Sequence, residues 1–184
     1  MREFTKLEAF RSRLGRLRRL AAERGQATVE FALVLPALLL LILGMVDFGK
    51  AFNYWIDSTH LANEAVRAAV VNQLPNGTTA VAACATQTIE CQIKQQANTG
   101  ELKNGGSSVS SPGLTITFCL PDGSGSVGDP LRAQATATYN WLGFLTGSFG
   151  AGLTSKIIKP TATMRLETGY DAGTSNYTAA ATCP

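Results

Sequence analysis

An apolar run near the N-terminus limits what this chain can fold into. Residues 31–46, FALVLPALLLLILGMV, contain no charged and no strongly polar side chain. The stretch from Ala27 to Val46 has twenty residues, and a helix of that length is about 30 Å long, which matches the hydrocarbon core of a bilayer. The sequence therefore predicts one membrane-spanning helix, in which Pro36 favours a local kink or unwinding.

The basic residues are concentrated before this run. Residues 1–25 contain eight of the sixteen Lys and Arg residues and three of the thirteen Asp and Glu residues, so the rest of the chain is net negative. A basic segment before an apolar span is typical of a segment that stays in the cytoplasm while the following part is exported. Nucleic-acid binding would need basic residues spread over a folded face, so we expect no nucleic-acid partner.

A carboxylate stands at the entrance to the span. Glu30 follows Gly25 by five residues, and a charge near a membrane span is costly and usually functional. A removed signal peptide would need a small-x-small site after the apolar run, and residues 44–55, GMVDFGKAFNYW, offer none that is clear. A plain signal anchor leaves Glu30 without a role.

A cut before the span gives Glu30 a role. If a peptidase cuts between Gly25 and Gln26, the new α-ammonium of Gln26 lies one helical turn from the Glu30 carboxylate. In an assembly, the Glu30 carboxylate of one subunit can then pair with the Gln26 ammonium of the next, which gives each charge a partner in an apolar bundle.

A basic leader, Gly25, Glu30 at the fifth position after the cut and a retained span together resemble prepilins of the type IV filament superfamily. Residues 25–52, GQATVEFALVLPALLLLILGMVDFGKAF, are similar to the start of TadE-like proteins, the minor pilins (pseudopilins) of Tad (tight adherence, Flp) pilus systems. Residues 159–167, KPTATMRLE, are similar to the last strand of that family. Major Flp pilins usually carry Glu-Tyr where this chain has Glu30-Phe31, and the greater length of this chain points to a minor component.

The resemblance implies a pilus subunit that is not an enzyme and that serves adhesion and surface colonisation. The implied partners are a prepilin peptidase, other minor pilins, the major Flp pilin, an ATPase-driven export platform and membrane lipids. The implied location is the inner (cytoplasmic) membrane, as a single-pass protein with a cytoplasmic N-terminus and an extracytoplasmic head, or the surface pilus. The alternative is an uncleaved signal-anchored protein whose head binds an extracytoplasmic ligand.

The sequence shows no motif for catalysis or for a cofactor. It has no nucleophile–base motif, no phosphate-binding loop and no dinucleotide fingerprint. The chain has a single histidine, His60, and a lone histidine without a second ligand is usually a packed or solvated side chain. We therefore expect no catalytic residue, no cofactor and no metal.

Hydrophobic periodicity predicts an α+β fold, in which a long N-terminal helix packs on a small antiparallel sheet of about three strands, as in pilins. We expect the first helix to extend to about residue 73, with Phe52, Tyr54 and Trp55 as an aromatic belt at the membrane surface. A second helix is expected over residues 78–98, and alternating runs predict three strands at 114–120, 132–141 and 159–167. The expected domains are a leader (1–25), a transmembrane half-helix (26–47), an extracytoplasmic half-helix (48–74), an α+β head (75–167) and a flexible C-terminal tail (168–184).

Four cysteines, Cys84, Cys91, Cys119 and Cys183, follow the span. An even number on the exported side predicts two disulfides, with three pairings open. If residues 78–98 form one regular helix, Cys84 and Cys91 are about 10 Å apart along its axis, too far for a disulfide. Each would then pair with Cys119 or Cys183, whereas a break in the helix would allow the Cys84–Cys91 bond.

The connection at residues 141–153, WLGFLTGSFGAGL, is unusually rich in aromatic residues and glycines. Exposed apolar loops often mark contacts with partners, whereas the same residues would cap the core if they were buried. We predict that Trp141, Phe144 and Phe149 form a subunit contact.

Overall fold

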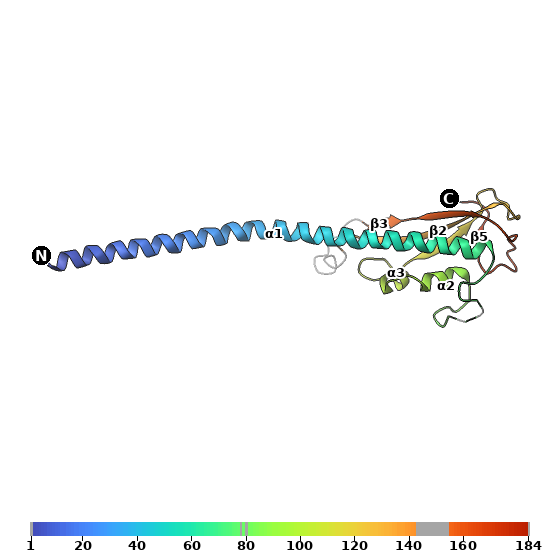
Figure 1. Ribbon diagram of the computed structural model, residues 1–184, viewed down its shortest axis with the longest axis horizontal. Coiled ribbons are helices and arrows are strands. Elements are labelled where there is room, and N and C mark those ends of the chain that lie inside the picture. The colour runs from blue at the N-terminus through green and yellow to red at the C-terminus, as the bar shows by residue number, and fades with distance from the viewer. Residues whose placement is uncertain (1, 78, 80, 143–154, 184) are drawn as a thin grey trace. The chain divides into compact units, whose positions relative to one another are not determined.

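The computed structural model describes residues 2–77, 79, 81–142 and 155–183, and of residues 2–25 it describes only the backbone. The chain forms two compact units, Met1–Val46 and Asp47–Pro184. Figure 1 shows the long helix α1, Arg2–Val70, and the smaller elements of the second unit. An α+β fold with a long N-terminal helix and a sheet is therefore confirmed.

In the first unit, α1 presents its apolar side chains outward. The apolar residues from Val29 to Val46 include many large side chains that remain exposed. The most apolar 18-residue window of this helix has a mean hydropathy of 2.6, and none of the window is buried. By length and composition, this helix can cross a membrane. The helix continues through Pro36 without a break, so the predicted unwinding is absent.

Within the described residues, the second unit contains one five-stranded sheet. The strand order is β3-β2-β1-β5, and β4 also pairs with β2. Strand β5 runs parallel to β1, whereas β1, β3 and β4 are antiparallel to β2. The strand bounds are β1 Thr115–Cys119, β2 Pro130–Asn140, β3 Ser155–Ile158, β4 Thr161–Arg165 and β5 Ala179–Ala180. The three predicted strands correspond to β1, β2 and β4.

Strand β2 has a buried face made largely of small residues. Its side chains alternate between buried and half-buried positions as the sequence predicts. The buried side chains are Leu131, Ala133, Ala135, Ala137 and Tyr139. Helix α1 contributes Leu61, Ala62, Ala65, Val66 and Ala69 to the same core. Because alanine side chains are short, a helix can approach a sheet closely over such a face and pack without voids.

Strands β3 and β4 lie along one edge of β2 in the same register. The chain is interrupted between the two strands, but the pairing with β2 continues without a shift. Asn140 pairs with Ser155 in β3, and Pro130 pairs with Arg165 in β4. The break falls at Pro160, which has no N–H to give to the ladder. The Pro160 carbonyl still accepts a hydrogen bond from the Ala135 N–H at 3.1 Å. Strand β3 is therefore the N-terminal continuation of the predicted strand.

The prediction of one helix over residues 78–98 is wrong. Helix α2, Ile89–Gln95, and helix α3, Gly100–Asn104, are both short. Thr88 caps α2, because its hydroxyl accepts a hydrogen bond from the Cys91 N–H, and Thr99 caps α3 in the same way. These N-caps fix where the helices begin, and the apolar spacing upstream of Thr88 does not extend α2.

The late start of α2 decides the disulfide pairing. Cys84 lies outside the helix, and its Cα is 5.8 Å from that of Cys91, to which it is bonded. Cys119 at the end of β1 is bonded to Cys183, with 5.1 Å between the Cα atoms. The pairings expected for an unbroken helix therefore do not occur, and the pairing that required a broken helix does.

The C-terminal stretch is folded rather than a flexible tail. Tyr177 is only 3% exposed and belongs to the core. The Asn176 N–H donates to Asn72 Oδ1 at 2.7 Å, and the Asn176 side-chain amide donates to the Asn72 carbonyl at 3.0 Å. Asn72 follows the end of α1 with a φ of 51°, a left-handed conformation that asparagine tolerates. The C-terminal stretch therefore holds the last turn of α1.

We expect the two disulfides to contribute unequally to stability, because the entropy removed from the unfolded chain grows with loop length. The bonded cysteines are separated by 64 residues in Cys119–Cys183 and by 7 in Cys84–Cys91. Replacing both cysteines of the first pair by alanine should lower the free energy of unfolding by about 4 kcal/mol, and of the second by about 2.5 kcal/mol. Urea titration of the full-length protein in detergent micelles measures both losses. A larger loss for the short loop would contradict this prediction.

Candidate functional site

The residues predicted for processing and assembly lie on α1 in the first unit. Gly25 lies within the helix, and Gln26, Glu30 and Phe31 are exposed. The Gln26 side-chain amide donates a hydrogen bond to Glu30 Oε1 at 3.0 Å. Residues four apart share one helix face, so Gln26 and Glu30 lie on the same face of α1, and the pairing between subunits stays a prediction.

Only one of the three residues predicted for the subunit contact lies in the described part of the chain. Trp141 is half-buried. Its ring stacks on Phe48 with 6.5 Å between the ring centroids, and it meets the Tyr139 ring edge-on at 5.2 Å. Phe144 and Phe149 lie outside the described residues. Trp141 thus joins the end of β2 to the part of α1 in the second unit.

A buried carboxylate lies next to this aromatic cluster, at the start of the second unit. Asp47 is only 3% exposed. Its Oδ1 accepts a hydrogen bond from the Tyr139 hydroxyl at 2.7 Å, and its Oδ2 accepts one from the Leu142 N–H at 2.8 Å. The Tyr139 hydroxyl also lies 3.0 Å from the Asp47 carbonyl oxygen. Both carboxylate oxygens are therefore bonded, which offsets the cost of burying them.

The sequence does not predict the Asp47–Tyr139 contact, because its partners are 92 residues apart. One signal was present: an aspartate directly after an apolar run is expected to find a donor if it is buried. The i,i+3 neighbour Lys50 is the obvious local partner, but its ammonium donates to the Ser108 hydroxyl at 2.6 Å.

A second tyrosine–carboxylate pair joins α1 to α3. The Tyr54 hydroxyl donates to Glu101 Oε2 at 2.7 Å, and the Ser107 hydroxyl donates to Oε1 at 3.0 Å. Tyr54 is only 5% exposed, so its predicted place in an exposed aromatic belt is wrong. Its ring instead packs in the core against Tyr139, with 5.8 Å between the centroids.

Burial, hydrogen bonds and nearby charges together set the charge states of Tyr54, Glu101 and Tyr139. Burial raises the pKa of Tyr54 to about 12, assisted by its hydrogen bond to Glu101 and by the charge of Glu101. Burial alone would raise the pKa of Glu101, but hydrogen bonds from Tyr54 and Ser107 and the charge of Lys50 lower it overall. Burial, followed by the hydrogen bond to Asp47, raises the pKa of Tyr139 well above its usual value. At neutral pH the tyrosines are therefore neutral donors and Glu101 is ionised.

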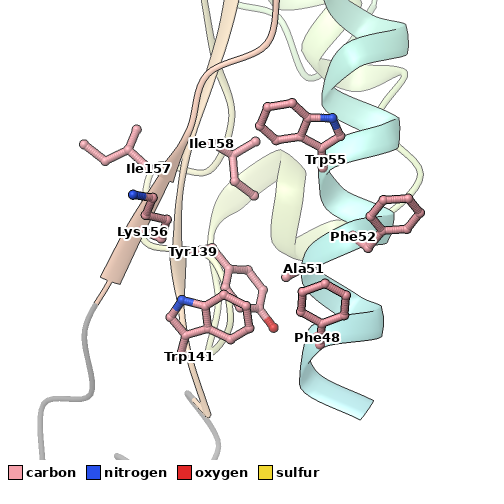
Figure 2. Close-up of a pocket in the computed structure, with 9 residues that line it drawn as sticks. All are labelled: Phe48, Ala51, Phe52, Trp55, Tyr139, Trp141, Lys156, Ile157 and Ile158. Atoms are coloured by element: carbon pink, nitrogen blue, oxygen red, sulfur yellow. The ribbon is translucent and has the colours of Figure 1, made fainter. Parts of the chain in front are cut away.

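A groove of about 220 Å³ opens beside the aromatic cluster. Figure 2 shows that α1 forms one wall and the sheet forms the other. The lining residues are Phe48, Ala51, Phe52 and Trp55 from α1, and Tyr139, Trp141, Lys156, Ile157 and Ile158 from the sheet and the end of β2. The groove is thus lined almost entirely by apolar and aromatic side chains, with one lysine.

No metal ligand set can be assigned within the described residues, where no group of three or more His, Cys, Asp and Glu side chains could hold a metal ion. The features that the geometry does present are an exposed apolar stretch of α1 with Glu30 at its start, and an aromatic groove next to a buried carboxylate. Both are suited to contacts with other chains or with lipid.

The family model described as TadE-like protein matches residues 25–69. The match begins at the predicted cleavage position and ends one residue before the end of α1. The resemblance inferred from the start of the sequence is therefore confirmed over this stretch, and the similarity of residues 159–167 to the last strand of the family lies outside the match. No curated protein and no solved structure matches the chain.

Tyr139→Phe is expected to lower the free energy of unfolding by about 1–3 kcal/mol, because it leaves a buried oxygen of Asp47 without its hydroxyl donor. Tyr54→Phe is the matched control. It likewise removes a tyrosine hydroxyl that donates to a carboxylate, but this carboxylate, Glu101, is partly exposed and keeps its bond from Ser107. A smaller loss is expected for the control. Urea titration of the full-length protein in detergent micelles compares the two variants. Equal losses would contradict the prediction that the buried Asp47 depends more on its hydroxyl donor than Glu101 does.

Proposed function

Because residues 25–69 form a TadE-like segment, which associates the chain with the Tad pilus machinery, we propose that this protein is the precursor of a minor pilin (pseudopilin). The basic leader is removed after Gly25, and the mature chain begins at Gln26. The apolar helix is retained in the inner membrane, and the head lies outside the cytoplasm. The mature protein is not an enzyme and takes part in assembling an adhesive pilus.

The observation that carries this proposal is the placement of Glu30. Glu30 directly precedes an apolar run whose side chains are exposed, and it shares a helix face with Gln26. A carboxylate costs free energy at the edge of the hydrocarbon region. Pairing with the α-ammonium at Gln26 of a neighbouring subunit would offset that cost and would set the register of the two helices.

The exposed apolar surface of α1 supports an assembly role. Leu33, Leu39 and Met45 are spaced six positions apart, which places them on three different faces of the helix, and all three are exposed. Such a helix can exchange lipid contacts for contacts with the helices of neighbouring pilins. The proposed partners are a prepilin peptidase, other minor pilins, the major Flp pilin and the export platform.

Cleavage can be tested by the intact mass of the protein recovered from membranes of cells with and without the prepilin peptidase. We expect the chain to lose residues 1–25 only where the peptidase is present. Mass spectrometry is preferable to sequential degradation, because an N-terminal glutamine can cyclise and block that chemistry. A chain that begins at Met1 in both strains would favour the alternative, an anchored extracytoplasmic protein that binds a ligand.

Glu30→Gln is expected to leave membrane insertion and cleavage intact and to abolish co-assembly with other pilins, because the neutral amide cannot form an ion pair with an ammonium. Glu64→Gln is the matched control, since Glu64 lies on the same helix and pairs with Arg67 at 3.7 Å. The readout is the amount of processed protein that co-purifies with pilus subunits. Normal co-assembly of the Glu30 variant would rule out the proposed pairing.

A further inference from the structure

The groove in the second unit presents apolar side chains that the proposed role of the apolar span does not use. Phe48, Phe52 and Trp55 are 63%, 58% and 49% exposed, and Ile157 on β3 is 50% exposed. The three aromatic residues are spaced by four and three positions, so they lie on one face of α1. A cluster of large exposed apolar groups usually marks a contact surface.

Chain connectivity limits the distance between Phe48, one residue of this surface, and the end of the apolar run. Phe48 follows Val46 by two residues. Consecutive Cα atoms are about 3.8 Å apart, so the Cα atoms of these two residues lie within about 8 Å of each other, whatever the orientation of the two units. If the apolar run fills the hydrocarbon core, Phe48 of the groove lies close to the point where the chain leaves it.

The side chains of the groove have the chemistry of a membrane surface. The chain contains two tryptophans, and both of them, Trp55 and Trp141, line the groove. Tryptophan prefers the interface between hydrocarbon and water, because its ring is apolar and its N–H is polar. Lys156 also lines the groove and is exposed, and a lysine at this level can reach anionic or zwitterionic phosphate groups.

The sheet wall of the groove is held in place by the buried carboxylate. Trp141 packs against both Tyr139 and Phe48. The Tyr139 hydroxyl is in turn bonded to Asp47. The volume of about 220 Å³ is smaller than that of ordinary small-molecule sites, which are roughly 300–1,000 Å³. The groove therefore suits a segment of a thin apolar chain better than a compact ligand.

We propose that this groove binds an acyl chain of a phospholipid of the membrane that holds α1, and that the head is thereby seated on the bilayer. The proposal rests on the membrane anchoring included in the proposed function, and it is independent of cleavage after Gly25 and of pairing through Glu30. The experiment has to distinguish binding of an acyl chain from binding of a second copy of this chain to the same surface.

The two tryptophans make the test selective, because both are in the groove. The full-length, uncleaved protein is placed in lipid nanodiscs at one chain per disc, with phospholipids that are either plain or brominated on their acyl chains. Trp55→Phe leaves Trp141 as the remaining tryptophan, and Trp141→Phe leaves Trp55. We expect the emission of each remaining tryptophan to be quenched by the brominated lipid.

Quenching of Trp141 is the decisive result, because this residue comes from the end of β2 and not from α1. Quenching of Trp55 alone would overturn the proposal, since a helical aromatic belt would then suffice. Loss of Trp141 quenching by the brominated lipid when each disc holds two chains would also overturn the proposal, in favour of a contact between copies.

A pair of matched variants tests the groove itself in the Trp55→Phe background. Ile157→Ser removes an exposed apolar side chain from the groove, and Val127→Ser removes one that is exposed outside it. We expect Ile157→Ser to reduce quenching of Trp141 and Val127→Ser to leave it unchanged. Because both side chains are exposed, neither change should unfold the protein, which circular dichroism verifies. Equal quenching in the two variants would overturn the proposal.

Discussion

The second unit depends on one buried interaction, the hydrogen bonds that Asp47 accepts from Tyr139 and from the Leu142 N–H. Helix α1 passes from an exposed apolar stretch to a stretch that packs in a protein core, and Asp47 stands at that change. A buried carboxylate is tolerated only where donors are already positioned. These donors come from the end of β2, so satisfying Asp47 also fixes where β2 ends against α1.

This contact and the small residues of the core act together. Alanines on β2 and α1 allow close approach of helix and sheet, but alanine buries little apolar area, and each such contact contributes little. Larger side chains supply more of the buried area, among them Tyr54 and Tyr139 near Asp47 and Phe118 and Tyr177 near β5. The Cys119–Cys183 disulfide holds that second end, where β5 has only two residues.

Local patterns in the sequence predict most of the fold. Period-two alternation identifies β1, β2 and β4, and the apolar run identifies α1. The errors arise where a local pattern is overridden by distant partners or by caps. Thr88 starts α2 eleven residues later than its apolar spacing suggests, and β5 exists only because it pairs with β1. Gly25 and Glu30 are proposed from their spacing and stay predictions. The Asp47–Tyr139 contact and the groove could not be predicted, because they require segments about ninety residues apart to meet.

The two carboxylates that border the apolar run, Glu30 and Asp47, differ in burial and in hydrogen bonding, and the difference bears on function. Sixteen residues separate Glu30 from Asp47 in the sequence. Asp47 receives two hydrogen bonds from its own chain and is buried, which makes it a structural residue. Glu30 is exposed, and the bond described for it comes from the neutral amide of Gln26. If the apolar run lies in lipid, the neutral amide of Gln26 does not balance the Glu30 carboxylate at its edge, and the proposed cut after Gly25 would supply a compensating charge.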